Sequence, residues 1–134
     1  MARPIAREAA MQLVFEQIFG GEGVTETLVD LIDYAPAEND RQYIDMVVAG
    51  VKEHAADLDA EITACLRGGT LEGRSRVDLA IQRMSVFEMK YAGLAPAISI
   101  NEAVELTRKY SSESSCSFIN GVLGTISRKL AAKA

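Results

Sequence analysis

The stretch Ile98-Ser-Ile-Asn-Glu-Ala-Val-Glu-Leu106, followed by Phe118-Ile-Asn-Gly-Val-Leu123, decides the fold. Each segment repeats apolar residues at a spacing of three to four, which buries one face of a helix. Ser99 and Glu102 have the spacing of a capping box, so we expect the first of these helices to begin at Ser99. The predicted buried residues are Ile100, Ala103, Val104, Thr107 and Tyr110 in the first helix, and Phe118, Ile119, Val122, Leu123, Ile126 and Leu130 in the second.

The same periodicity, with capping and glycine signals, predicts five further helices upstream. Ser75 and Asp78 form a second capping-box pattern at the start of the last of these. No segment alternates like a strand, and no hairpin signal is present. The sequence therefore predicts an all-α chain of about seven helices, joined by short loops. The upstream helices are expected at about Pro4 to Gly20, Thr25 to Pro36, Asn39 or Asp40 to His54, Asp57 to Leu66, and Ser75 to Tyr91.

The composition is that of one ordinary globular domain. The chain has 134 residues, of which 49% are hydrophobic and 25% charged, and this length suffices for a buried core. No apolar run is long enough to span a membrane, and the N-terminus lacks the pattern of a signal peptide. Cys65 and Cys116 are expected to be two separate thiols in a reducing compartment. We therefore expect a cytoplasmic protein.

Charge is distributed unevenly along the chain. Residues 1–66 hold 4 basic and 13 acidic side chains, whereas residues 67–134 hold 10 basic and 6 acidic ones. The net charge of −5 argues against a general polyanion binder. The basic half leaves room for a local nucleic-acid patch, and the alternative is an ordinary solvated surface.

No active site is predicted. His54 is the only histidine, and no nucleophile and base share a recognisable spacing. The glycine-rich stretches 20–23 and 67–69 lack the lysine and the strand context of a phosphate-binding loop. We therefore expect neither an enzyme activity nor a cofactor nor a metal.

Binding residues are easier to nominate. Arg3 and Arg7 are four residues apart near a predicted helix N-terminus, an arrangement that suits a phosphate or simply solubilises the surface. Arg83 could flank a groove or cover apolar surface with its stem. Lys109 complements the C-terminal end of its helix. Phe118 fits the core, or a position near Lys109 where it would stack on an unpaired base.

The two C-terminal segments resemble the NusB family of transcription antitermination factors. Ala6-Arg-Glu-Ala-Ala-Met-Gln12, residues 43–50 and residues 83–91 agree with the same family, so the resemblance covers nearly the whole chain. The resemblance implies two helical bundles packed as one compact RNA-binding domain over residues 1–134.

The resemblance also implies a function. NusB-like proteins bind boxA, a short single-stranded RNA element, together with NusE, which is also a small-subunit ribosomal protein, and so act on the RNA polymerase elongation complex indirectly during ribosomal RNA transcription. Carried onto this chain, the partner surface would use Phe15 and Asp78, with Asp78 exposed at its helix start. Both a monomer and a homodimer stay open. The implied RNA surface comprises Arg3, Arg7, Arg83, Lys109, Ser117 and Phe118.

Two alternatives are open. The same domain type serves as the RNA-recognition part of ribosomal-RNA cytosine methyltransferases, but the chain up to Ala134 has no room for a catalytic domain, so methyl transfer is not expected. The other alternative is a helical protein-interaction module with weak or no RNA binding. The acidic first half and the small number of N-terminal arginines favour that alternative.

Overall fold

The computed structural model describes residues 4–20, 35–66 and 75–133, and every regular element within them is a helix. This confirms the predicted all-α class. Arg3 and most of the helix expected from Thr25 lie outside the described residues. The five described helices are α1 (Pro4–Ile18), α3 (Glu38–Thr63), α4 (Arg76–Lys90), α5 (Pro96–Tyr110) and α6 (Glu113–Lys133).

Helix α3 corrects one prediction. Two helices were expected between Asn39 and Leu66, with Asp57 capping the second, but the chain forms one continuous helix of 26 residues. The sequence around Asp57 contains no proline or glycine, so nothing interrupts the helix. The Asp57 carboxylate instead accepts hydrogen bonds from Lys90 Nζ (2.7 Å) and the Tyr91 hydroxyl (2.5 Å) at the end of α4.

The start of α5 corrects a second prediction. The helix begins at Pro96 with Ala95 as its N-cap, so the predicted capping box at Ser99 is wrong. Proline has no N–H to leave unpaired in a first turn and a φ angle already suited to the helix, which makes Pro96 the better start. Ser99 is fully buried, and its Oγ lies 2.7 Å from Ser85 Oγ on α4. By contrast, Ser75 does cap α4, since its Oγ accepts from the Asp78 amide at 3.3 Å.

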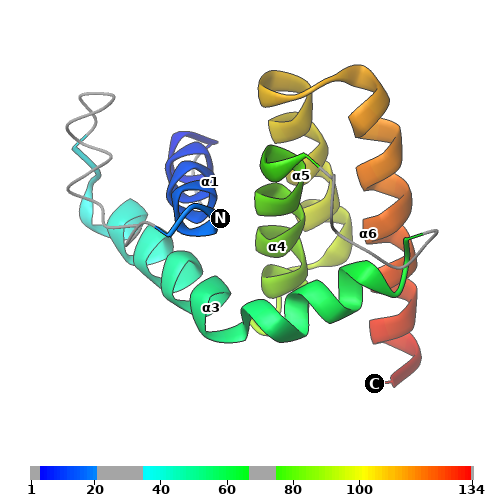
Figure 1. Ribbon diagram of the computed structural model, residues 1–134. Coiled ribbons are helices and arrows are strands. Elements are labelled where there is room, and N and C mark those ends of the chain that lie inside the picture. Colours follow the sequence, from blue (N-terminus) through cyan, green and yellow to red (C-terminus); the bar gives the residue numbers. More distant parts are fainter. Residues whose placement is uncertain (1–3, 21–34, 67–74, 134) are drawn as a thin grey trace.

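Helix α4 packs against the other four described helices. Figure 1 shows α1 beside the first half of α3, and α4, α5 and α6 standing together over its second half. One cluster of buried apolar residues connects all five helices, so the two groups form one compact domain. Gly50 permits the close approach of α3 to α4, because a Cβ there would lie 2.2 Å from Phe87 Cε1.

Two further predictions from the sequence concern the cysteines and membrane-spanning helices. Cys65 is half-buried and Cys116 buried, and both are free thiols, as expected. No helix in the described ranges is long and apolar enough to cross a membrane.

Candidate functional site

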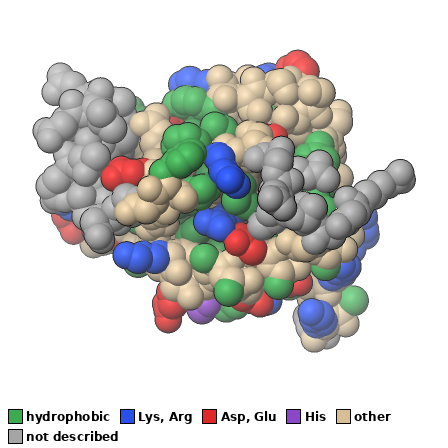
Figure 2. Space-filling model, in the orientation of Figure 1, with side chains coloured by type: hydrophobic (Ala, Val, Ile, Leu, Met, Phe, Trp, Pro, Cys, Tyr) green, Lys and Arg blue, Asp and Glu red, His purple; other side chains and the backbone are tan. Residues whose placement is uncertain are grey.

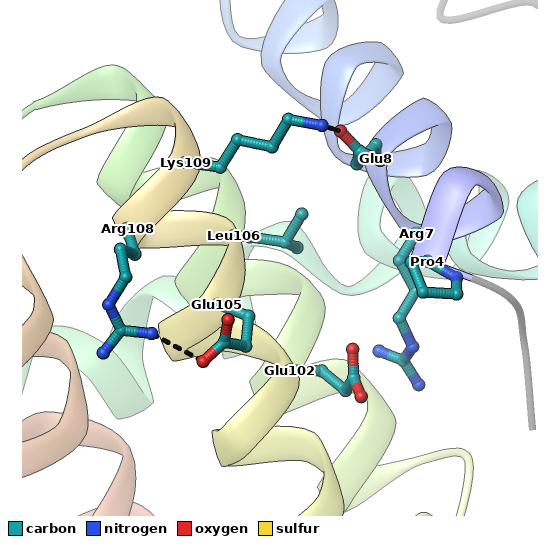
Figure 3. A pocket seen from close by; sticks show the side chains of 8 residues that line it. All are labelled: Pro4, Arg7, Glu8, Glu102, Glu105, Leu106, Arg108 and Lys109. Carbon is teal, nitrogen blue, oxygen red and sulfur yellow. Dashed lines mark hydrogen bonds and ion pairs between the residues drawn. The ribbon is translucent and has the colours of Figure 1, made fainter.

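A pocket of about 300 Å³ lies between α1 and α5. The close-up in Figure 3 shows Lys109 and Leu106 of α5 directed toward α1, whereas Arg108 points away toward Glu105. The pocket brings together Arg7 and Lys109, two of the residues expected to bind RNA, although they are far apart in sequence. The lining residues are Pro4, Arg7 and Glu8 from α1, and Glu102, Glu105, Leu106, Arg108 and Lys109 from α5.

The exposed cations of this pocket are paired with carboxylates. Lys109 Nζ forms a hydrogen bond and ion pair with Glu8 Oε1, across from α5 to α1. Arg108 contacts Glu105 at 2.5 Å and Glu113 at 3.2 Å. Because each positive charge already has a negative neighbour, a phosphate would have to compete for these cations.

The Glu8–Lys109 pair shifts the pKa of both groups. The hydrogen bond that Lys109 donates to the Glu8 carboxylate raises the pKa of Lys109 above its ordinary value. Partial burial pushes the pKa of Glu8 upward, but the hydrogen bonds from Lys109 and from the Tyr110 hydroxyl (2.6 Å) outweigh it, and the net pKa is lowered. Both groups are therefore charged around neutral pH.

Arg7 does not have the surface position that the sequence suggested. Its side chain is 3% exposed, and Nη1 lies 2.9 Å from Glu88 Oε2. The Tyr43 hydroxyl donates to the same Glu88 oxygen at 2.8 Å, and the Arg7 guanidinium lies over the Tyr43 ring. Arg7 thus forms a wall of the pocket while its charge is bound inside the protein, and an RNA contact by Arg7 stays a prediction.

Glu88 and Tyr43 were missed by sequence reasoning. They lie 81 and 36 positions from Arg7, so no local pattern links the three residues. Burial raises the pKa of Tyr43, and the neighbouring Glu88 carboxylate raises it further. Tyr43 therefore stays a protonated donor that helps to hold the buried Glu88 carboxylate.

The other predicted RNA residues lie outside the pocket. Arg83 makes two hydrogen bonds of 2.7 Å to Asp59, which join α4 to α3. Ser117 is exposed on α6, whereas Phe118 is partly buried and packs against the core. The structure therefore assembles only part of the predicted set around one pocket.

Of the two predicted partner residues, Asp78 differs from expectation. We expected an exposed side chain, but Asp78 is 6% exposed and begins the run of buried residues that continues through Leu79 and Ala80 of α4. Phe15 is partly buried against the core and meets the ring of Phe19 edge to face, with centroids 5.0 Å apart. Phe19 is 64% exposed, and the sequence analysis did not single it out. A contact of Phe15 or Asp78 with a partner stays a prediction.

Among the described residues, no cluster of three or more histidine, cysteine, aspartate or glutamate side chains could hold a metal ion. The single histidine, His54, stacks on the Tyr91 ring at a centroid distance of 3.9 Å. The side chains that line the pocket offer charged groups and hydrogen-bonding groups for binding.

Comparisons with known proteins agree on one family. A sequence model of the NusB family matches residues 4–128. A transcription antitermination protein NusB from Acetivibrio thermocellus is 40% identical over 128 residues, which covers 94% of this chain and 88% of that protein. Its counterpart from Clostridium botulinum (strain Kyoto / Type A2) is 36% identical over 140 residues and covers 92% and 98%.

Solved structures share the fold. A structure of the antitermination factors NusB and NusE in complex with dsRNA contains a chain that superposes with a TM-score of 0.84. The two chains are 21% identical, and the match covers 95% of this chain and 96% of that one. The likeness is one of overall fold.

Proposed function

The chain belongs to the NusB family, and from this premise we propose that it is a transcription antitermination factor that binds boxA-type single-stranded RNA together with NusE during ribosomal RNA transcription. The family is one of antitermination factors and not of enzymes, in agreement with the absence of catalytic motifs in the sequence. The observation that carries the RNA part is the pocket between α1 and α5, with Lys109 at its rim.

Lys109 is the phosphate contact that the geometry supports best. Its side chain is 61% exposed, and its ammonium lies where α1 and α5 meet. Arg108, the next residue on α5, does not share this face, because consecutive residues of a helix point in different directions, and Figure 3 shows it beside Glu105. Phosphate contacts of this kind position an RNA without reading its bases. Ser117 and Phe118 of α6, and Arg3, stay in the proposed RNA surface on the strength of the family resemblance.

The proposed NusE surface involves α1 and the start of α4. Figure 2 shows hydrophobic side chains gathered over α1 and its border with α4, with Lys and Arg side chains beside them. Apolar patches of this kind are typical of protein contacts. Within the described residues, Asp78 Oδ1 is buried and accepts no hydrogen bond. Because this atom is closed to solvent, Asp78 stays in the proposed surface on the strength of the family resemblance alone.

The test is a binding titration with boxA-type RNA, with and without NusE. We expect the NusE complex to bind the single strand more tightly than the same sequence paired in a duplex. We expect Lys109→Ala to reduce the slope of log affinity against log salt by about 0.7, the value for one phosphate contact on a single strand. Lys133→Ala, which removes the same charge from the exposed end of α6, is the matched control and should leave the slope unchanged.

Two results would contradict the proposal. If the NusE complex binds neither form of the RNA, the function is wrong. If the Lys109 and Lys133 variants give equal slopes, the pocket is not the RNA site.

The second candidate function is a protein-interaction module without RNA binding. The observation that favours it is the pairing of Lys109 and Arg108 with carboxylates of the same pocket. It predicts normal NusE binding and no measurable RNA affinity in the same titration.

A further inference from the structure

The contact between Glu8 and Lys109 lies at the point where the proposed function needs a free cation. The two residues are separated by 101 positions and join α1 to α5. Figure 3 shows their side chains meeting across one side of the pocket, with Leu106 below them. The same Glu8 oxygen also accepts a hydrogen bond from the Tyr110 hydroxyl. The Tyr110 hydroxyl oxygen in turn accepts a hydrogen bond from Gln12 Nε2 at 3.5 Å.

This pairing differs from that of the neighbouring cation. Arg108 and Glu105 are three residues apart on one helix, so their contact follows from helix geometry alone. The Glu8 carboxylate comes from a different helix and is 19% exposed, whereas its lysine partner is 61% exposed. Glu8 is thus a fixed acceptor, and Lys109 is the group that is free to turn toward another anion.

We propose that Glu8 is a built-in competitor of RNA phosphate, which sets RNA affinity by holding the Lys109 ammonium. The inference rests on the proposed function. Binding is then an exchange, in which a phosphodiester oxygen takes the place of the Glu8 carboxylate on Lys109.

The experiment is a double-mutant cycle on the RNA affinity of the NusE complex. Glu8→Gln keeps the size and an acceptor oxygen, so α1 and α5 remain hydrogen-bonded while the charge is removed. We expect it to raise RNA affinity about two- to fivefold at low salt, the range for an exposed ion pair. The gain should shrink as salt is added, because exposed charges are screened. Combined with Lys109→Ala, the substitution should give no gain.

Glu105→Gln is the matched control, because it removes one carboxylate from the same pocket without freeing Lys109. A general electrostatic effect would make the gains of the two glutamine variants equal, and each would persist in the Lys109→Ala background. That result would overturn the inference. The inference would also be wrong if the parent binds RNA and Glu8→Gln binds it with the same affinity.

The outcome also separates the inference from the function on which it rests. If neither the parent nor Glu8→Gln binds RNA in the NusE complex, the proposed function fails and the competitor role fails with it. If the parent binds and only the Glu8 effect is missing, the function stands and Glu8 serves merely to join two helices.

Discussion

Replacing Arg7 by methionine tests whether the buried ion pair holds α1 to α4. Methionine has a similar length and no charge, so the substitution leaves Glu88 as a buried carboxylate with only hydroxyl partners. Glu88 is 3% exposed, and it accepts from the Tyr43 hydroxyl at 2.8 Å and from Ser99 Oγ at 3.4 Å. Two neutral donors do not replace the guanidinium.

The expected loss is large. Removing one member of a buried pair costs about 3–5 kcal/mol, because the remaining charge is uncompensated. For a chain of 134 residues, an unfolding entropy of about 2.1 cal/mol/K per residue converts this into a fall in Tm of roughly 10–18 °C. The double variant Arg7→Met with Glu88→Leu should lose less than the single one, since it removes both charges.

The measurement is urea unfolding followed by circular dichroism, with Arg108→Met as the control. Arg108 carries the same charge but is 47% exposed, so its loss should cost no more than about 1 kcal/mol. If both methionine variants lose equal stability, the buried pair does not stabilise the domain.

Four further predictions concern stability. Gly50→Ala should cost about 1–3 kcal/mol in urea unfolding, because its Cβ would overlap the buried Phe87 ring. Gly121→Ala, whose Cβ would meet no atom within 4 Å, should instead stabilise α6 by up to about 1 kcal/mol; a loss there would contradict the described packing. Ser75→Ala should cost about 0.5–2 kcal/mol in unfolding free energy, and no loss would place the start of α4 elsewhere. The lowered pKa of Glu8 means that its stabilising contribution is present above its ordinary pKa of 4.5 and is lost as the pH falls through the lower folded value. The difference in unfolding free energy between the parent and Glu8→Gln should therefore shrink toward acid pH; a constant difference would exclude a charge effect.

The helices were predictable where the signal is local. Ser75 caps α4 as its spacing suggested, because a cap involves residues only three positions apart. Ser99 has the same pattern, but Pro96 starts that helix earlier and Ser99 is used inside the core. The prediction that Asp57 caps a separate helix was wrong for a related reason, since its partners Lys90 and Tyr91 lie at the end of another helix. Equivalent local patterns are thus decided by tertiary contacts that the sequence does not display.

The candidate site was predictable only in part for the same physical reason. The sequence identified Lys109 as a cation at a helix end, but not Glu8 as its partner from a helix about a hundred residues earlier. Arg7 could be recognised as a cation near a helix N-terminus. Its burial depends on Glu88 and Tyr43, and only the folded arrangement places these side chains together.

The uninterrupted course of α3 has a consequence for how the domain opens. Because one helix contacts both α1 and α4, neither group of helices can separate without breaking backbone hydrogen bonds in the middle of a continuous helix or exposing the apolar face of α4. We therefore expect local opening to be confined to helix ends, and the two groups to exchange their amide hydrogens with solvent as one cooperative unit. A surface assembled from both groups, such as the pocket between α1 and α5, keeps its shape through fluctuations that would pull two separately folding halves apart.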